Sequence, residues 1–223
     1  ATVAANTVTA DIGGDLTVES LQDTARYDSK QSSAGGSITV GLAGGIPVGV
    51  TGSASIGNAK VKGDYASVTD QSGFKAGDGG FQVDVGGKTA LKGAAITSSE
   101  AAVQNGANRF ASAGGTTLED IRNRDDYKAT GASLSGGYGK SEGSGGNPGN
   151  LQNFAGGTNG GAAGYGSAKG SQSSTTASAI SGIAGDTQAR TGDKRSGALA
   201  KAWDGQQLER EVQAQTQITA TFG

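Results

Sequence analysis

One stretch of the sequence occurs twice, with its copies 100 positions apart. GDLTVESLQDTARYDSK starts at Gly14, and GGTTLEDIRNRDDYKAT starts at Gly114, so that Tyr27 matches Tyr127. Chance produces many glycine matches in a chain this rich in glycine, and the matched Tyr, Glu and Leu/Ile positions therefore carry the weight. Long-period similarity of this kind is typical of repeat architectures, in which each repeat packs on its neighbour.

The sequences downstream of the two copies also correspond. Ala59-Lys60 aligns with Ala168-Lys169, and both pairs lie in Gly- and Ser-rich surroundings. We therefore expect a duplicated unit rather than one repeated motif.

The repeats must fold with few large apolar side chains. Of 223 residues 42 are Gly, and the hydrophobic fraction is 34% with 5% aromatic residues. Two alternatives remain, a flat repetitive β architecture with a thin core or partial disorder. Disorder of the whole chain is not favoured, because alternating β-branched runs are frequent and the formal net charge is only -2.

Alternation of apolar and small residues predicts specific strands. Residues 36–56 contain two alternating runs on either side of Gly44-Gly45, which predicts a hairpin. Aliphatic residues on one face and small residues on the other suit a strand facing lipid and equally a strand packed on a rod. Residues 79–97 look like one coil of a parallel β-solenoid. We predict a mainly β fold, a right-handed parallel β-solenoid-like rod with β-hairpin excursions and a short C-terminal helix.

The repeats suggest a division of the chain. We expect a first β-repeat module at 1–97 and a second at 98–195, with a Gly/Ser-rich loop at 140–175. A C-terminal helical segment at 196–223 is expected to contain a helix near 205–219, because its apolar residues have helical spacing.

The residue types present exclude most catalytic chemistry. The sequence has no His and no Cys, which rules out Ser-His-Asp and Cys-His catalysis within this chain and removes the usual zinc ligands. A carboxylate pair that cleaves polysaccharide stays formally open, and the densest acids are Glu119-Asp120 and Asp125-Asp126. Adjacent acids usually mark a solvated face, so we expect no catalytic residue.

Two short motifs resemble ligand sites only in part. Gly139-Lys140-Ser141 matches the end of a phosphate loop, but Leu134 stands where that motif needs Gly. Asp78 and Asp84 flank a single imperfect copy of a calcium-binding repeat, which needs tandem copies to share each ion. We therefore expect no cofactor-binding or metal site.

Four aromatic residues could contact a partner, but such residues more often close a thin core. They are Tyr27, Tyr65, Tyr127 and Trp203. We favour packing for Tyr27 and Tyr127 because they recur at equivalent positions. Leu208 and Val212 are expected to pack against the end of the rod rather than against a membrane.

Charge and hydropathy argue against two other partners. The 18 Lys and Arg are scattered among 20 Asp and Glu with no basic patch, which argues against nucleic acid. No apolar run approaches the roughly 20 residues of a membrane helix. The chain has no Met and starts at Ala1, which suggests an internal fragment of a longer protein. The absence of Cys fits a chain that crosses an envelope without forming disulfides.

Several stretches together resemble one known family. IGGDLTVESLQDTARYDSKQSSAGGSITVG, KVKGDYASVTDQSGFKAGDGGFQVDVGGKTALKGAAITS and LEDIRNRDDYKA are similar to the second filamentous-haemagglutinin repeat region of contact-dependent growth inhibition effectors. These are CdiA-type exoproteins of two-partner secretion systems. SSTTASAISGIAGDTQARTG and LEREVQAQTQITATFG resemble the stretch that leads to the pretoxin segment of this family. The pieces occur in the family's order and cover nearly the whole chain.

The resemblance implies a function and a location. It implies a secreted surface protein of a Gram-negative cell, exported through an outer-membrane partner either directly or after retention in the periplasm, with a variable toxin at its extreme C-terminus. The region similar to this chain would help the toxin across the outer membrane of the target cell, engaging that membrane or a receptor. The alternative is a passive adhesin stalk. Self-association through exposed ends is also expected.

Overall fold

The computed structural model describes residues 1–43, 45–141, 157–193 and 197–222 of the chain. These residues are mainly β-strand with two helices, and they form two compact units. Unit 1 contains residues 1–25, 64–126 and 171–202, and unit 2 contains residues 26–63, 127–170 and 203–223. Each unit is therefore assembled from three separate stretches of sequence.

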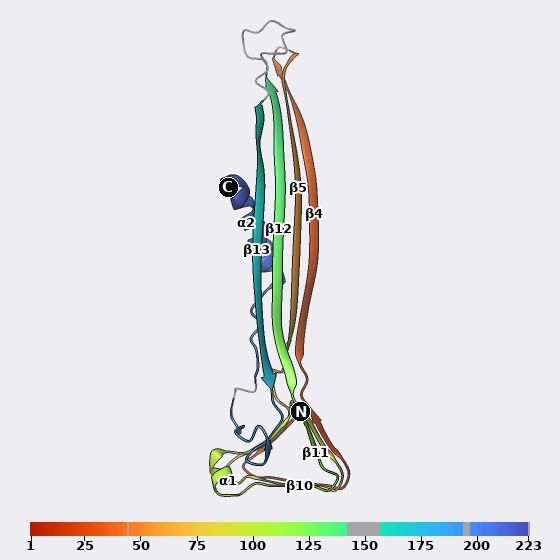
Figure 1. Cartoon of the computed structure of the whole chain (residues 1–223), viewed down its shortest axis with the longest axis vertical. Helices are drawn as coiled ribbons and strands as arrows, with labels where there is room; N and C mark the ends of the chain where they lie inside the picture. Colours follow the sequence, from red (N-terminus) through yellow and green to blue (C-terminus); the bar gives the residue numbers. More distant parts are fainter. Residues whose placement is uncertain (44, 142–156, 194–196, 223) are drawn as a thin grey trace. The chain divides into compact units, whose positions relative to one another are not determined.

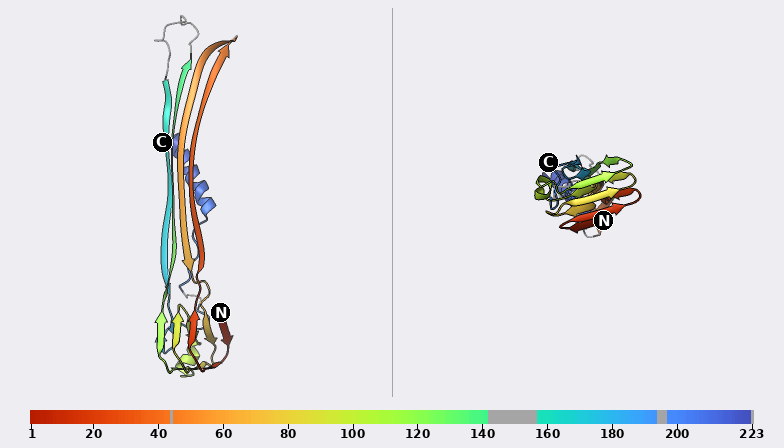
Figure 2. Two further views of the ribbon diagram at one scale, coloured as in Figure 1. Left: turned by 90° about the vertical axis from the view of Figure 1, so that its right-hand side faces the viewer. Right: turned by 90° about the horizontal axis from the view of Figure 1, so that it is seen from below.

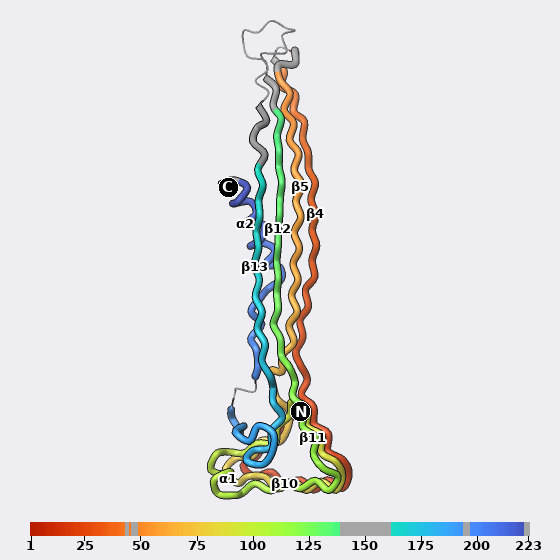
Figure 3. The backbone as a smooth tube through the Cα atoms, in the orientation of Figure 1, coloured from red at the N-terminus to blue at the C-terminus, as the bar shows by residue number. Residues whose placement is uncertain are grey.

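Unit 1 is built from short strands that the chain forms in three successive passes, which Figure 3 traces as three-sided loops. The passes consist of β1 (Thr2–Ala5), β2 (Val8–Ile12) and β3 (Leu16–Glu19), then β6 (Gly73–Ala76), β7 (Phe81–Val85) and β8 (Thr89–Lys92), then β9 (Ala95–Thr97), β10 (Arg109–Ser112) and β11 (Thr116–Glu119). Each pass gives one strand to each of three sheets, and strands of successive passes pair in parallel (Figure 2). A short helix, α1 (Glu100–Gln104), lies between β9 and β10.

The strand registers show that the first duplicated stretch is a structural repeat. Val18 and Leu118 both pair with Leu91, one from each side. The side chain of Lys92 lies 3.1 Å from Glu19 and 3.8 Å from Glu119, and its hydrogen bond with Glu19 raises the pKa of Lys92. Positions 100 apart therefore occupy equivalent places on the two sides of the middle pass.

The core of unit 1 is a narrow column of apolar side chains. Phe81, Val83, Leu91, Ile96 and Ile180 are all almost fully buried, although every one of them lies on a strand of five residues or fewer. Alternate residues of β7 point inward, as the buried, exposed, buried pattern of a strand with one covered face requires. A thin core of this kind fits the small number of large apolar residues in the sequence.

Unit 2 contains one sheet of long strands and a helix, seen side by side in Figure 1. Its strands are β4 (Asp23–Ala43), β5 (Ile46–Ser67), β12 (Ile121–Ser141) and β13 (Gly157–Thr176), and its helix is α2 (Gly205–Phe222). One end of each strand, residues 23–25, 64–67, 121–126 and 171–176, belongs to unit 1. The strand order is β13-β12-β5-β4, so that β4 and β13 are the edges.

Contacts across the sheet fix how its strands pair. For β4 with β5, Asp28 lies 3.5 Å from Lys62, and the Ser37 and Ser53 hydroxyls are 2.8 Å apart. As the residue number rises on one strand it falls on the other, so the pair is antiparallel.

The other two pairs of the sheet are antiparallel by the same test. Between β5 and β12, Arg124 binds Asp64 at 3.0 Å, and a methyl group at Gly57 would lie against the carbonyl of Ala132. Between β12 and β13, Ser171 donates a hydrogen bond to Asp126, and Ser135 donates to the carbonyl of Ala162 at 3.4 Å.

Helix α2 packs closely on one face of the sheet because glycine occupies that face. A methyl group at Gly131 would lie 2.5 Å from Cγ1 of Val212, and one at Gly164 would lie 2.0 Å from the carbonyl oxygen of Thr216. Val212 and Leu208 are buried in this contact. These two residues were expected at the end of a rod, and the structure places them on the face of the sheet instead.

The predicted fold class is wrong as a description of this chain. The mainly β content agrees with the prediction, but the strands form several sheets, and a right-handed parallel β-solenoid-like rod does not account for them. The longest strands form an antiparallel sheet, and β14 (Ala179–Ile180) pairs antiparallel with β15 (Ala184–Gly185). Short connections such as the one between β4 and β5 can join only antiparallel neighbours, since a parallel pair needs a long crossover.

Two local predictions have different outcomes. The helix expected near 205–219 is α2, and the hairpin expected at 36–56 is formed by β4 and β5. The loop expected at 140–175 is wrong from residue 157 onward, where β13 forms, and residues 142–156 lie outside the described part of the chain. The division at 97 and 195 stays a prediction, because it concerns sequence modules.

Candidate interaction surface

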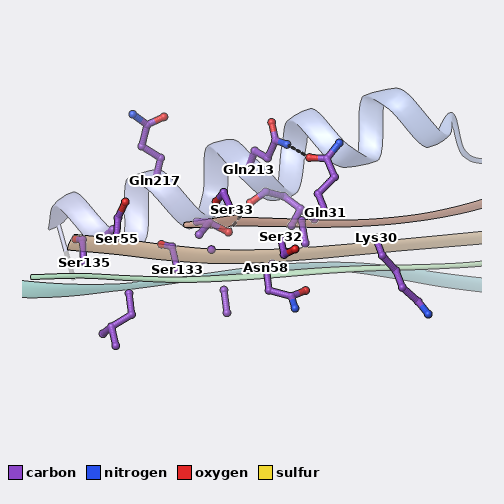
Figure 4. A pocket seen from close by; sticks show the side chains of 18 residues that line it. Lys30, Gln31, Ser32, Ser33, Ser55, Asn58, Ser133, Ser135, Gln213 and Gln217 are labelled. Carbon is purple, nitrogen blue, oxygen red and sulfur yellow. Dashed lines mark hydrogen bonds between the residues drawn. The ribbon is translucent and has the colours of Figure 1, made fainter. Parts of the chain in front are cut away.

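The two faces of the sheet in unit 2 differ in what covers them. The ring of Tyr27 lies against Gly205 of α2, and Gly131 lies under Val212, so odd-numbered residues of β4 and β12 face the helix. In β13 the even-numbered Gly164 and Gly166 do so. We call this side the helix face and the opposite side the open face. In Figure 4, Gln31 points toward α2, whereas Lys30 and Asn58 point away from it.

A polar groove runs along the helix face beside α2. Its volume is about 930 Å³, and eight of its eighteen lining residues are Ser or Gln (Figure 4). The side-chain amide of Gln213 on α2 donates a hydrogen bond of 3.0 Å to Gln31 on β4. Hydroxyl and amide groups of this kind can bind a ligand through hydrogen bonds, but they supply no nucleophile with a base beside it.

The open face exposes a set of large apolar side chains. Eight of the twelve large apolar residues that are exposed in the described chain lie here, so exposure is concentrated on one surface. Ile38 is 81% exposed and Leu42 is 64% exposed. We call this set the apolar band: Ile38, Val40, Leu42, Val50, Ile56, Leu134, Tyr138 and Tyr165. Exposed apolar residues gathered on one face mark a site of contact with a partner or a membrane.

In unit 1, several side chains hold the segment 197–202 by its backbone, among them Ser174, whose hydroxyl donates a hydrogen bond to the carbonyl of Gly197. We call four of the others the clasp. Tyr65 donates a hydrogen bond of 2.8 Å to the carbonyl of Leu199, and Ser67 accepts one of 2.8 Å from its N–H. Asp125 accepts a hydrogen bond of 2.8 Å from the N–H of Ala202.

The fourth member, Asn123, is fully buried at the centre of a hydrogen-bond network. Its amide donates to the carbonyl of Gly197 at 2.9 Å and to Thr176 at 2.9 Å, and its carbonyl accepts from the N–H of Val68 at 3.0 Å. Buried polar groups need such partners, because an unpaired group loses its hydration without compensation. The clasp therefore fixes the chain just before α2.

The acids considered for catalysis have structural partners. Asp120 accepts a hydrogen bond of 2.8 Å from the N–H of Ser178, and Asp126 accepts one from the Ser171 hydroxyl. Asp125 belongs to the clasp, and Glu119 lies beside Lys92. These contacts do not bring two carboxylates together over a shared cleft, and the absence of a catalytic residue stays a prediction.

The residues of the two short motifs do not gather with other side chains that could bind a metal ion or a phosphate. Asp84 forms a bidentate ion pair with Arg109, at 2.8 and 3.0 Å, and Asp78 is exposed. Residues 139–141 end strand β12, and their side chains lie outside the described part. In the residues that the structure describes, no three Asp or Glu side chains gather where they could hold a metal ion.

The four aromatic residues that were considered as partner contacts pack rather than project. Tyr65 and Trp203 are almost fully buried, and Trp203 lies against Gly63. Tyr127 lies over Gly170 of β13, whereas Tyr27 lies against α2. Desolvation raises the pKa of Tyr27, and its hydrogen bond to Glu209 raises that pKa further. The two recurring tyrosines thus share a packing role but have different partners.

Sequence reasoning missed the clasp and part of the apolar band. The residues of the clasp are polar and scattered, and no local pattern marks them. The alternation at 36–56 did indicate part of the band, but Leu134, Tyr138 and Tyr165 lie in stretches with little apolar periodicity. Within the described chain, neither helix has the length and hydropathy to cross a membrane.

Comparison with known proteins identifies related sequences. Residues 1–34 match the family model described as haemagglutinin repeat. The chain is 48% identical over 147 residues to a toxin CdiA of Escherichia coli, an alignment covering 63% of this chain and 4% of that protein. It is 44% identical over 132 residues to a tRNA nuclease CdiA of Yersinia mollaretii, covering 58% of this chain and 4% of the relative.

A third CdiA relative matches the chain with similar identity over a shorter alignment. The chain is 45% identical over 105 residues to a deoxyribonuclease CdiA of Yersinia pseudotuberculosis, covering 47% of this chain and 10% of that protein. The chain thus spans a small part of the length of the relatives it matches. No solved structure matches it. These matches confirm the resemblance to CdiA-type exoproteins that the sequence indicates.

Proposed function

We propose that this chain is a non-catalytic structural and toxin-delivery segment of a secreted contact-dependent growth inhibition effector. It would help a C-terminal toxin cross the outer membrane of the target cell. The relatives are named as a toxin, a tRNA nuclease and a deoxyribonuclease, yet the aligned region is only 4–10% of their length. One shared segment beside different named activities supports a common role in delivery.

The apolar band carries this proposal. Ile38 and Leu42 are more than half exposed, and an apolar face of this kind lowers the solubility of a protein. Such a face is expected where a partner or a membrane covers it. Neighbouring strands of the band pair through their backbone groups, so that unpaired groups remain only on the outer edges of β4 and β13. We propose that the band contacts the outer membrane of the target cell.

The remaining parts of the proposal follow from the family resemblance. The parent protein would be exported through an outer-membrane partner to the cell surface, with retention in the periplasm before delivery. A non-catalytic role is supported by a sequence with no His or Cys, which leaves no base for a nucleophile of the usual kinds.

The test is flotation of the purified chain with vesicles made from bacterial outer-membrane lipid. The variant Ile38→Ser/Val40→Ser/Leu42→Ser should reduce the bound fraction at least about tenfold, because three aliphatic side chains no longer leave water on binding. The matched control is Val3→Ser/Leu21→Ser/Ile183→Ser, which removes three exposed apolar side chains from unit 1. It should bind like the unaltered chain.

A passive adhesin stalk is the alternative that this experiment separates. A stalk only displays other parts of its protein, so the unaltered chain would remain with the lipid-free fraction. Equal losses in the two triple variants would also contradict a specific role for the apolar band.

A further inference from the structure

Four lysines lie on the open face of unit 2, one on each strand of the sheet. They are Lys30 on β4, Lys60 on β5, Lys128 on β12 and Lys169 on β13, and all are exposed. Lys30 points away from α2 in Figure 4. The other three share its face, because the antiparallel registers align even positions of β4, β5 and β12 with odd positions of β13.

The same registers bring the four lysines into a single row. Asp28 pairs with Lys62, and two residues further along Lys30 therefore lies opposite Lys60. Arg124 pairs with Asp64, and four residues further along Lys128 lies opposite Lys60.

The fourth lysine follows from the last strand pair. Ser171 pairs with Asp126, and two residues further along Lys169 lies opposite Lys128. Contacts on the far side of the row, such as Ser37 with Ser53, keep the registers unbroken. We call this set the lysine row, with neighbours about 4.8 Å apart at the backbone.

None of the four lysines forms an ion pair in the part of the chain that the structure describes, since no carboxylate there lies within ion-pair distance of their amines. Two acids lie on the same face one step along the strands: Asp28, which forms its ion pair with Lys62, and Asp126, which accepts a hydrogen bond from the neutral Ser171 hydroxyl. Like charges placed directly opposite on neighbouring strands destabilise a sheet. A row of four is thus costly to the free chain, and a bound anion would remove that cost.

The position of the row beside the apolar band indicates which anion. Ile56 of the band is four residues from Lys60 on the same face of β5, about 13 Å along the strand. Basic side chains next to an apolar surface match a lipid, whose phosphate headgroup adjoins its acyl chains. A polynucleotide also carries phosphates, but it has no acyl chains that could contact the apolar band.

We propose that the lysine row binds the phosphate groups of anionic lipid headgroups while the apolar band contacts the same membrane. This inference rests on the proposed function and adds to it the headgroup chemistry and the residues that recognise it. The formal net charge of the whole chain is -2, so its attraction to an anionic surface must come from a local site such as this one.

The test compares two variants that each lose two positive charges. Lys60→Gln/Lys128→Gln removes the centre of the row, and the control Lys75→Gln/Lys88→Gln removes two lysines of unit 1. Binding is measured by flotation with vesicles of phosphatidylcholine alone and with equal parts of phosphatidylcholine and phosphatidylglycerol. The row variant should bind the anionic vesicles about tenfold to thirtyfold less well, and the control less than about threefold. Added salt should weaken binding of the unaltered chain.

A second readout separates lost recognition from lost folding. Removing like charges from the row should leave the melting temperature of Lys60→Gln/Lys128→Gln unchanged or raise it. The inference is overturned, with the proposed function intact, if this variant binds anionic vesicles normally while Ile38→Ser/Val40→Ser/Leu42→Ser does not. It is also overturned if the row variant loses binding only to a single-stranded oligonucleotide. No binding of the unaltered chain to any vesicle would overturn both proposals.

Discussion

Glycine sets the distance between the helix and the sheet in unit 2. At Gly164 the space where a side chain would lie is filled by the backbone of α2, with the Thr216 carbonyl oxygen 2.0 Å from the position of a Cβ atom. A backbone atom cannot rotate away as a flexible side chain can. Any side chain at this residue must therefore displace the helix.

We expect Gly164→Ala to destabilise unit 2 by about 1–3 kcal/mol, the usual cost of forcing an extra methyl group into a packed contact. The matched control is Gly136→Ala on β12, where an added methyl group meets nothing within 4 Å. Urea unfolding followed by fluorescence would report on the contact, because Trp203 is the single tryptophan and lies in unit 2. Equal midpoints for the two variants would show that the helix is not held this closely.

At the scale of elements, the clasp connects the strands of unit 1 to the segment before α2. Asn123 is the centre of this connection, since its amide and carbonyl together bind β13, the segment at 197 and the backbone of Val68. Asn123→Ala leaves several buried groups unpaired, so we expect a loss of more than about 3 kcal/mol in unfolding free energy. Hydrogen exchange should show the N–H groups of Leu199 and Ala202 losing protection.

The control for the clasp is Asn58→Ala, which removes the same type of side chain from the open face. It should change the unfolding free energy by less than about 0.5 kcal/mol, as exposed surface substitutions usually do. Protection at Leu199 that survives Asn123→Ala would mean that the segment is held by other contacts.

Elements with a local sequence signal were predictable, and those that depend on distant partners were not. The β4–β5 hairpin and α2 follow from alternation of period two and from helical spacing. Strand β13 has almost no large side chains, and it forms because its glycines fit beneath α2 and its backbone pairs with β12. The prediction of a parallel β-solenoid for the whole chain was wrong because the long strands β4, β5, β12 and β13 pair antiparallel with one another.

The candidate surface was predictable only in fragments. Lys60 and Lys169 already correspond when the two halves of the sequence are aligned, and the aliphatic face of 36–56 is visible by alternation. That four lysines form one row depends on three strand registers, and a register is set by contacts between residues far apart in sequence.

At the scale of the whole molecule, open strand edges predict self-association. β4 is an edge of its sheet, and residues 31–43 of this strand carry neither charge nor proline, the devices that usually block pairing of an edge with another chain. We expect the average mass in analytical ultracentrifugation to rise with protein concentration. Ala34→Lys should weaken the association about tenfold, since charged side chains on an edge strand disfavour its pairing with another chain.

Ala54→Lys is the control, because it places the same charge on the same face of an inner strand. It should leave the association unchanged. A chain that stays monomeric at high concentration would show that the edge of β4 is protected in some other way.

The clasp also limits which residue types can occupy positions 197–202 in related proteins. The clasp binds Gly197, Leu199 and Ala202 only through hydrogen bonds to their peptide groups, so these bonds do not depend on the side chains at the three positions. Proline should be excluded at 199 and 202, where the N–H donates, and Gly197 should persist because its φ is +78° and a side chain would meet the Thr175 carbonyl.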